Sequence, residues 1–332
     1  MKSIAVLLPV YNSETHLREA IDSILLQSFG DYNFYIINDG STDSSEEVIL
    51  SYSDKRIIYL KNEQNKGLVF TLNKGIEAIT EKYIVRMDAD DIAFENRLEF
   101  QLKYMEDHPA CIVCGSQTET FGEEFYLSNL PISFSDIKTQ LIFNSPIAHP
   151  TVIIRTEILK KNDIYYSDRI LHMEDYYLWL RLSELGELHN LPYPLLKYRM
   201  SGQNITIKNW STREERLKLI YKKILRDLEI EPNEDNLRFH LELGGNTKSI
   251  NNISKLRNYS KELIVQNGRM HIYSQISLKN YIQVLWNKVF FKVADIGFWE
   301  TVNYWFQSKS VSIIQLHYFL GIFRFKILKP NK

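Results

Sequence analysis

The sequence has very little of several features that define large protein classes. Only 2 of its 332 residues are cysteine, which excludes a disulfide framework and is typical of a reducing compartment. Basic and acidic residues nearly balance (40 against 41), and the net charge of −1 argues against nucleic-acid binding. No apolar run reaches transmembrane length, no repeat is evident, and no leader peptide precedes the first strand-like run. We therefore expect a cytoplasmic protein.

A glycine-rich phosphate loop is also absent after the first apolar run. This run, at residues 4–8, continues into the letters PVYN at residues 9–12. Dinucleotide-dependent dehydrogenases and sugar-nucleotide pyrophosphorylases need a glycine-rich turn at this point, so both enzyme classes are disfavoured. The hydrophobic content of 44% is enough for one large domain with an appendage.

Strand-like and helix-like segments alternate along the first quarter of the chain. Buried strands are expected at residues 4–8, 34–37, 57–60 and 83–87. The first three runs are each followed by a segment of helical period, which predicts a parallel sheet with crossover helices. Tyr11, Asp39, Asn65 and Asp88 would then meet at one edge of the sheet, where open α/β sheets bind their ligands.

Three carboxylates lie within the four residues DADD at 88–91, directly after the fourth strand. Like charges at this spacing repel one another, so a fold keeps them together only with a positive partner. A hard divalent cation shared with a diphosphate suits such oxygen ligands. The alternative is a solvated acidic turn that caps the next helix.

Four motifs, in chain order, resemble the successive motifs of family 2 glycosyltransferases. They are LPVYN at residues 8–12, INDGSTD at 37–43, NKG at 65–67 and RMDADD at 86–91. The resemblance covers roughly residues 3–205. It implies the GT-A fold, a Rossmann-like mixed α/β sheet flanked by helices, and an inverting, metal-dependent sugar transfer from a nucleotide-diphosphate donor.

The resemblance also implies the domain organisation. A catalytic domain is expected at residues 1–208, with a nucleotide-sugar half to about residue 91 and an acceptor half at 92–208. A helical C-terminal region, residues 209–332, resembles no family that we can name.

The family pattern implies nucleotide contacts position by position. By resemblance, Pro9, Tyr11 and Glu14 lie along the nucleotide, and Asp39 accepts a hydrogen bond from the imide N–H of uracil. This carboxylate favours a UDP-sugar, because cytosine has an acceptor at that position; alternatively, Asp39 only starts the turn before Gly40. The remaining implied contacts are Asp88 on the ribose, Asp90 on Mn²⁺ or Mg²⁺, and Asn65, Gly67, Arg86 and Ala89 around the nucleotide.

A second acidic pair, Glu174 and Asp175, opens a segment that resembles the family's catalytic-base motif. The resemblance makes Asp175 the general base and Glu174 its orienting or acceptor-binding neighbour. Leu178 and Leu182 predict a helix with both carboxylates in its first turn, where the helix dipole favours acidic residues irrespective of catalysis. We expect the same dipole to lower the pKa of Asp175 and keep it ionised at neutral pH.

Two more residues are candidates for the acceptor, sugar or diphosphate site. His149 could bind the metal, hydrogen-bond a sugar hydroxyl or only satisfy backbone carbonyls, and the sequence leaves these three alternatives open. Arg199 matches the family's closing segment and offers a positive charge to phosphate, with an ion pair to a surface carboxylate as the alternative. Ser201 stands where the family often has histidine, which weakens any metal-ligand role for that loop.

The two cysteines, Cys111 and Cys114, lie three residues apart in a strand-like run. Residues at this spacing in a strand point to opposite faces, and no second cysteine pair could complete a zinc site. We therefore expect two buried, reduced thiols.

The end of the chain differs in composition from the rest. From residue 277 it carries eight Lys or Arg against two acidic residues, a net charge of +6, and it is rich in aromatics. A basic, aromatic, helical tail can lie in an anionic membrane interface, which would place the protein peripherally on the cytoplasmic face, near a lipid-linked acceptor. The alternative is a helical subdomain packed on the catalytic core or on a second copy, as in a homo-oligomer.

The function predicted is an inverting glycosyltransferase for surface polysaccharide. It would move a sugar from a nucleotide-diphosphate donor, a UDP-sugar by the argument above, to a hydroxyl of a glycan or lipid-linked oligosaccharide. The alternative is a catalytically silent subunit that binds nucleotide-sugar or glycan on the same fold. The joint presence of Asp90 and Asp175 favours the enzyme, because a silent relative has no reason to keep both.

Overall fold

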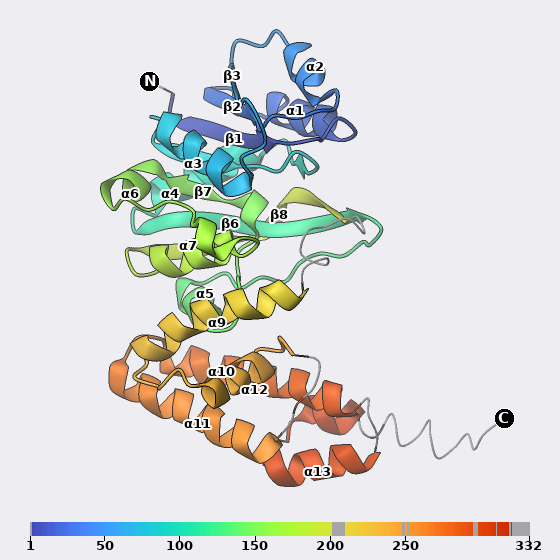
Figure 1. The fold of residues 1–332 in the computed structure, drawn as a ribbon, viewed down its shortest axis with the longest axis vertical. Coiled ribbons are helices and arrows are strands. Elements are labelled where there is room, and N and C mark those ends of the chain that lie inside the picture. The colour runs from blue at the N-terminus through green and yellow to red at the C-terminus, as the bar shows by residue number, and fades with distance from the viewer. Residues whose placement is uncertain are drawn as a thin grey trace, which may run out of the picture. The chain divides into compact units, whose positions relative to one another are not determined.

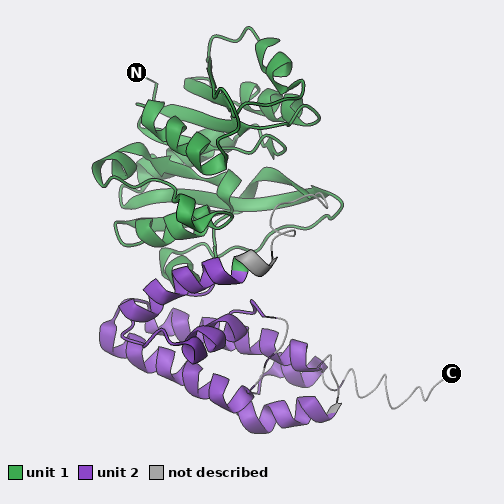
Figure 2. Cartoon of the chain, viewed as in Figure 1, with its two compact units in different colours: residues 1–141, 145–213 green, residues 142–144, 214–332 purple. Residues whose placement is uncertain are grey.

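The computed structural model describes residues 2–200, 210–247, 250, 252–294, 298–309, 311–318 and 320. The chain divides into two compact units (Figure 2). Unit 1 is formed by Met1–Leu141 and Ser145–Arg213, and unit 2 by Ile142–Asn144 and Glu214–Lys332. Unit 1 is an α/β structure, and unit 2 consists of helices in its described part (Figure 1).

The first half of the unit 1 sheet is parallel, as the alternation of strands and helices predicted. Strand β1 pairs with β2 on one side and β4 on the other, and β2 pairs with β3. The strands are β1 (Ile4–Val10), β2 (Tyr32–Asn38), β3 (Ile57–Lys61) and β4 (Tyr83–Arg86). The helices between them are α1 (Leu17–Leu25), α2 (Ser45–Leu50) and α3 (Leu68–Ala78).

The second half makes the sheet mixed. Its strands are β5 (Ile92–Ala93), β6 (Cys111–Gly122), β7 (Ile153–Arg155) and β8 (Glu187–Met200). Strand β7 is antiparallel to β4 and β6, whereas β6 and β8 are parallel. The complete order is β3-β2-β1-β4-β7-β6-β8-β5. The accompanying helices are α4 (Arg97–Asp107), α5 (Phe134–Gln140), α6 (Thr156–Lys161) and α7 (Glu174–Leu182).

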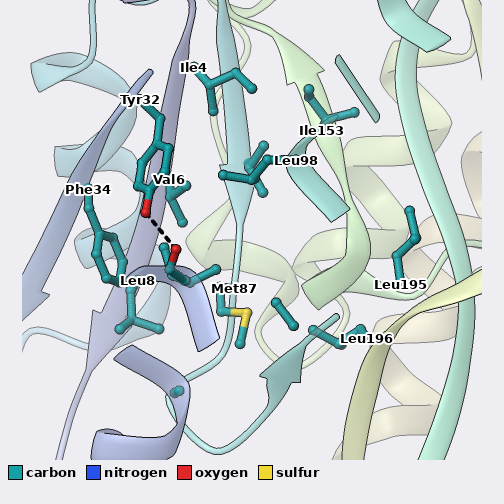
Figure 3. Close-up of a cluster of buried hydrophobic side chains, with 14 of the residues drawn as sticks. Ile4, Val6, Leu8, Tyr32, Phe34, Met87, Leu98, Ile153, Leu195 and Leu196 are labelled. Carbon is teal, nitrogen blue, oxygen red and sulfur yellow. Dashed lines mark hydrogen bonds between the residues drawn. The ribbon is translucent and has the colours of Figure 1, made fainter. Parts of the chain in front are cut away.

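One continuous apolar core covers a face of this sheet (Figure 3). Alternate residues of β1, namely Ile4, Val6 and Leu8, point into it, as the period of two along a strand requires. The Tyr32 hydroxyl, also inside this core, donates to the carbonyl of Ile24 at 2.5 Å (dashed in Figure 3). This carbonyl, in the last turn of α1, also accepts from the N–H of Gln27 at 3.2 Å, so both bonds fix the end of the helix. The core thus fixes the strands that lead to the site described below.

The two cysteines are free and buried, as expected, but the prediction that they point to opposite faces is wrong. Strand β6 has an irregularity in its pairing with β8 between Cys111 and Val113. A bulge adds one residue to the spacing and reverses the alternation. Cys111 and Cys114 therefore share the same core cluster.

Unit 2 has five labelled helices among the described residues, besides a short helical stretch at residues 313–318. They are α9 (Trp210–Asp227), α10 (Glu234–Leu243), α11 (Ile253–Met270), α12 (Gln275–Ala294) and α13 (Phe298–Ser308). Asparagine side chains cap two of them: Asn233 accepts from the N–H of Asn236 and Asn252 from that of Lys255, each at 2.9 Å. None of the helices in the described part of the chain is long and apolar enough to cross a membrane. The basic residues Arg324, Lys326, Lys329 and Lys332 lie outside the described residues.

Candidate functional site

The carboxyl ends of β1, β2 and β4 meet at one edge of the sheet, as the sequence predicted. In the parallel registers Val10 lies opposite Asn38, and Leu7 lies opposite Arg86. The N–H of Asp39 donates to the carbonyl of Val10 at 2.8 Å just beyond the strand ends. Pro9 is the second-last residue of β1 at this edge, and Tyr11, which is 46% exposed, follows the strand.

Asp39 is only 3% exposed and organises the turn that contains Asn65 and Gly67. Its Oδ1 accepts from the Asn62 side chain (2.7 Å) and the Lys66 N–H (2.9 Å), and its Oδ2 accepts from the Gly67 N–H (2.8 Å). A carboxylate has about four lone-pair positions, so a position remains for a donor on a ligand. The turn that Asp39 holds is the one at residues 62–67, whereas at the Asp39–Gly40 turn it is the Asn38 side chain that accepts from the N–H of Ser41. The contact of Asp39 with uracil stays a prediction.

At Gly40, directly after Asp39, the chain approaches the backbone of Gln64 and Asn65 in this turn. Its φ is +66°, and a Cβ at this position would lie 2.5 Å from the carbonyl carbon of Gln64. Both the backbone conformation and the close approach therefore require glycine here.

Glu14 has a hydrogen-bond partner within the protein. Its Oε2 accepts from the N–H of Ser44 at 2.8 Å, and its own N–H donates to Asp43 Oδ2 at 3.1 Å. Next to it, the side chain of Asn12 accepts from the N–H of Thr42 at 2.8 Å. Glu14 therefore joins the loop after β1 to the start of α2, and its contact with a nucleotide stays a prediction.

Asp88, Asp90 and Asp91 form one cluster, with a ligand oxygen from each within 4.8 Å of the others. Burial, followed by the charge of Asp88, raises the pKa of Asp90 to about 6. The same causes and the charge of Asp90 raise the pKa of Asp91 well above its ordinary range. Oδ2 of Asp91 is buried and finds no hydrogen-bond partner among the described residues. An oxygen-rich cluster with uncompensated negative charge fits a hard divalent cation.

Two buried arginines surround this cluster. Arg86 pairs with Asp88, donating from Nη1 to Oδ2 at 2.6 Å. Arg97 is fully buried and donates from Nη2 to the carbonyl of Arg86 at 2.7 Å and from Nε to Gln101 at 3.1 Å. Burial lowers the pKa of Arg97 to about 9, and the charge of Asp91 partly offsets this effect. The sequence analysis missed Arg97; its only signal was a charged residue at the start of an apolar helical stripe.

Arg199, near the end of β8, holds the acidic motif from the other side. Its N–H donates to Asp91 Oδ1 at 2.9 Å and its Nε donates to the carbonyl of Asp90 at 2.8 Å. It also forms an ion pair with the exposed Glu19. The ion-pair alternative is therefore present in the structure, and a contact of Arg199 with phosphate stays a prediction. Ser201 lies outside the described residues.

Glu174 and Asp175 occupy the first turn of α7, as predicted. The expectation of a lowered pKa for Asp175 is wrong: burial, followed by the charge of Glu174, raises its pKa to about 6. The N–H of Tyr176 and the Ser145 hydroxyl, which donates to Asp175 Oδ2 at 3.2 Å, only partly oppose this shift. A helix dipole contributes roughly 0.3–1 kcal/mol, and the removal of water outweighs it here. Burial also raises the pKa of Glu174.

The buried guanidinium of Arg86 connects the two acidic groups electrostatically. It acts to lower the pKa values of Asp90 and Asp91, and equally those of Glu174 and Asp175. Asp88 in turn raises the pKa of Glu174. Arg86 is thus within electrostatic reach of both acidic groups, which is consistent with a single site.

His149 lies in the same site, in the short 3-10 helix η1 (His149–Thr151). Its Nε2 is hydrogen-bonded to the Tyr166 hydroxyl at 2.8 Å. Burial, and secondly Arg86, lowers the pKa of His149 well below its ordinary value, so the ring is neutral. Of the three alternatives, a bond to backbone carbonyls is not what the described residues show; contact with sugar or metal stays open. Tyr166 and Ser145 have no distinguishing sequence signal, and both were missed.

Comparisons with known proteins identify the family and a similar fold. The model of the family described as Glycosyl transferase family 2 matches residues 5–162. An uncharacterized glycosyltransferase of Haemophilus influenzae is 32% identical over 273 residues, 77% of this chain and 80% of that protein. The amylovoran biosynthesis glycosyltransferase AmsE of Erwinia amylovora is 30% identical over 66% of this chain and 85% of its own length. The fold is similar to S. aureus TarS 1–349 in complex with UDP-GlcNAc, with a TM-score of 0.60, 16% identity and coverage of 93% and 91%.

Proposed function

The chain belongs to glycosyl transferase family 2 and is therefore a glycosyltransferase, and we propose that it is an inverting, metal-dependent enzyme that transfers a sugar from a UDP-sugar. The observation that supports the proposal is the buried Arg86, which pairs with Asp88 of the 88–91 cluster and also acts on the pKa of Asp175. The leaving diphosphate of the donor needs its developing negative charge neutralised, and the attacking hydroxyl of the acceptor needs its proton removed. Carboxylates could serve both needs, by holding a metal ion at 88–91 and by accepting the proton at Glu174–Asp175.

The donor half would be bound by the loops at the carboxyl edge of the sheet. Tyr11 offers an exposed ring to a base. The carboxylate of Asp39 is oriented by the Gly67 N–H of the Asn65–Gly67 turn and would accept a further hydrogen bond from the base. Pro9 and Ala89 border this edge, Asp88 would contact the ribose, and Glu14 would act by holding the loops. Two solved complexes of the structurally similar TarS contain UDP-GlcNAc or UDP, which supports a UDP-sugar as the first donor to test.

Mn²⁺ or Mg²⁺ would be held by Asp90, with Asp88 and Asp91 beside it. When bound, the ion neutralises charge that develops on the leaving diphosphate. The protein's part is to hold the carboxylates together, which Arg86, Arg97 and Arg199 do through the bonds described above.

Asp175 would act as the general base on the acceptor hydroxyl. Its pKa of about 6 leaves it mostly ionised at neutral pH and closer to the operating pH than an ordinary aspartate, which makes it a stronger base. Glu174, buried next to it, would orient the acceptor, and the neutral His149 would donate to or accept from a sugar hydroxyl. A single base on the face opposite the leaving group gives inversion without a covalent intermediate.

The decisive assay measures release of nucleoside diphosphate from a panel of nucleotide sugars, with and without Mn²⁺. We expect one UDP-sugar to be turned over only with the metal. Asp90→Ala should lose metal-dependent turnover, and Asp175→Asn should lose transfer yet still bind donor. Donor binding without turnover by the wild type under every condition would favour the alternative, a silent binding subunit, and full activity of Asp175→Asn would remove it as the base.

The acceptor would be a glycan or lipid-linked oligosaccharide in surface polysaccharide synthesis, as the name of AmsE suggests for that relative. Trp299 and Phe306 lie seven residues apart on one face of α13 and are 76% and 78% exposed. Lys309, Ile313 and Ile314 follow α13 in the chain and are also exposed. We call these five residues the α13 patch. Exposed aromatics beside lysines suit an anionic membrane interface.

Flotation of the full chain with anionic vesicles would test this partner. We expect the wild-type chain to bind anionic vesicles and not zwitterionic ones. The double variant Trp299→Ser/Phe306→Ser should not bind the anionic vesicles. Phe125→Ser, which removes an equally exposed aromatic side chain of unit 1, is the matched control and should bind like wild type. Equal flotation of the patch variant and wild type would contradict a membrane role, and loss of a wild-type dimer in the patch variant would identify a second copy as the partner instead.

A further inference from the structure

Tyr166 and His149 of unit 1 form a side-chain pair in which one nitrogen of the imidazole is already occupied. The Tyr166 hydroxyl lies 2.8 Å from His149 Nε2, and the two ring centroids are 5.3 Å apart. Tyr166 is only 5% exposed, whereas His149 is half-buried. Since Nε2 faces the buried hydroxyl, Nδ1 is the ring nitrogen that remains for a ligand.

This pair lies between the strand that leads to the acidic cluster and the helix that carries the proposed base. Val152, directly after η1, accepts from the N–H of Arg86 in β4 at 3.0 Å. On the other side, the His149 ring packs edge-on against Trp179 of α7, with centroids 6.0 Å apart. Trp179 follows Asp175 by four residues, which is about one helical turn. A sugar that passes from a diphosphate at the cluster to a hydroxyl at the base would therefore lie beside His149.

The direction of the hydrogen bond between Tyr166 and His149 follows from the partners of the hydroxyl. Burial raises the pKa of Tyr166, so the hydroxyl keeps its proton, and Nε2 is its one hydrogen-bond partner among the described residues. If Nε2 were the donor, the hydroxyl proton would be buried without an acceptor, which is costly. The hydroxyl therefore donates to Nε2. Since burial and Arg86 lower the pKa of His149 and keep it neutral, its single ring proton is on Nδ1.

Asn73 of α3 holds Tyr166 in this position. The N–H of Tyr166 donates to Asn73 Oδ1, and the amide of Asn73 donates back to the carbonyl of Tyr166, each at 2.9 Å. Two reciprocal bonds fix the backbone of Tyr166 in the loop that follows α6. Helix α3 begins directly after Gly67, whose N–H donates to Asp39 at 2.8 Å. One helix thus connects the turn proposed to bind the nucleotide with the tyrosine that contacts His149.

A metal-ligand role for His149 fits this arrangement poorly. Oxygens of Asp88, Asp90 and Asp91 lie within 4.8 Å of one another, and no histidine nitrogen of the described residues belongs to that group. A histidine ligand must also offer an unprotonated nitrogen to the metal. In His149 the lone pair of Nε2 accepts from Tyr166 and Nδ1 carries the proton, so neither nitrogen is available.

We propose that Tyr166 holds His149 as a hydrogen-bond donor: the Nδ1–H of His149 bonds to a hydroxyl of the transferred sugar, and His149 is not a ligand of the metal. Tyr166 is then a positioning residue that acts through His149, and Asn73 positions Tyr166. The inference deepens the proposed function and rests on it for the place of the sugar. It assigns one of the two roles that the geometry alone leaves open for His149.

The tautomer of His149 can be measured on the full chain without turnover. Two-bond ¹H–¹⁵N NMR of protein labelled with ¹⁵N-histidine separates protonated from unprotonated ring nitrogens, and His149→Asn assigns the signals by their loss. We expect a protonated Nδ1 and an unprotonated Nε2 in the wild type, and a mixture of tautomers in Tyr166→Phe. Tyr32→Phe is the matched control, because it removes a fully buried hydroxyl from the carbonyl of Ile24 in the apolar core (Figure 3). It should leave the His149 signals unchanged.

A second pair of variants tests the contact of Asn73 with the loop. Asn73→Ala should shift the tautomer populations of His149 in the same direction as Tyr166→Phe, but less. Asn162→Ala, which removes only an exposed side-chain bond to the carbonyl of Ile158, should not. A protonated Nε2 in the wild type would overturn the inference. So would an unmixed Nδ1–H tautomer in both Tyr166→Phe and Asn73→Ala, because the tyrosine would then not set the proton.

Binding of Mn²⁺ in the presence of UDP tests the exclusion of a metal-ligand role. The EPR signal of the free ion measures this binding without any sugar. His149→Asn should bind Mn²⁺ as the wild type does, whereas Asp90→Ala should lose binding. A loss of about tenfold or more in His149→Asn would identify His149 as a ligand or as the support of one, and would overturn the inference.

Turnover of the UDP-sugar tests the contact itself. The amide nitrogen of asparagine can occupy the place of Nδ1, whereas that of glutamine reaches the place of Nε2. We expect His149→Asn to exceed His149→Gln in kcat by about 3–10-fold, the equivalent of one neutral hydrogen bond. An equal or reversed order would overturn the sugar contact. Failure of the proposed function is distinguishable: the wild type would then turn over no UDP-sugar, while the NMR and Mn²⁺ results would still decide the tautomer and the metal role.

Discussion

The raised pKa of Asp175 makes a quantitative prediction for the wild-type enzyme. A base with a pKa of about 6 is about nine-tenths ionised at pH 7 and about one-tenth ionised at pH 5. We therefore expect kcat to fall about tenfold per pH unit well below pH 6. An ordinary aspartate, with its pKa near 3.9, would leave kcat flat to about pH 5.

Asp90 complicates the assay, because burial and Asp88 raise its pKa to about 6 as well. Protonation of Asp90 would weaken metal and donor binding and would therefore raise KM at low pH. The measurement is therefore kcat for transfer from pH 4.5 to 8, with donor and metal saturating at each pH. Residual transfer by Asp175→Asn should lack the acidic limb. A flat wild-type profile, or a limb that survives in Asp175→Asn, would refute the reasoning.

The same shift predicts a change in stability. The folded pKa of Asp175 lies above the unfolded value, so the folded state binds the proton more tightly, and the ionised carboxylate costs stability as pH rises from about 4 to 6. A shift of about 2 units corresponds to at most about 3 kcal/mol. Asp175→Asn should therefore unfold at higher urea than wild type at pH 7, with a smaller difference at pH 4. A variant less stable than wild type at pH 7 would show that the carboxylate is better stabilised than burial implies.

Four further substitutions test other parts of the structure. Gly40→Ala should destabilise the fold by about 2 kcal/mol and weaken donor binding, because both the +66° φ and the contact with Gln64 oppose it; Gly67→Ala, with φ +90° but no atom within 4 Å of the new Cβ, should cost about 1 kcal/mol. Arg97→Met should cost about 2–4 kcal/mol in urea unfolding, since it leaves the buried carbonyl of Arg86 without its donor. Lys82→Met, which breaks the exposed pair with Glu106 and a contact of the ammonium with the Tyr83 ring, should change stability by less than about 1 kcal/mol.

The first four strands and the edge of the sheet that they share were predictable because their signals are local. Apolar runs of four or five residues that end in Asn-Asp-Gly or Asp-Ala-Asp fix both the strand and the point where it stops, and parallel pairing then brings Tyr11, Asp39 and Asp88 together. The reversal of Cys111 relative to Cys114 was not predictable, because a bulge depends on the partner strand.

The predicted direction of the pKa shift of Asp175 was wrong for a related reason. The helix N-terminus is a local feature and was read correctly, whereas burial of α7 depends on residues that approach from elsewhere, such as Ser145 and Tyr166. The assignment of Ile142–Asn144 to unit 2 is likewise a tertiary fact. Sequence motifs thus located the candidate site, and packing decides how its groups ionise.

The site keeps several buried polar atoms unsatisfied, and this is what a ligand-binding function would require. Arg86 Nε, Asp91 Oδ2 and Glu174 Oε2 are all buried with no partner within the described part of the chain. Each such atom costs roughly 1–3 kcal/mol, so three of them in one site represent a large fraction of a typical domain's stability. A fold selected for stability alone would pair or remove them. Since Arg86 lies in the field of both acidic groups, a ligand that supplies charge to one group changes the electrostatics of the other. Donor binding should therefore alter the pKa of Asp175 before any acceptor arrives.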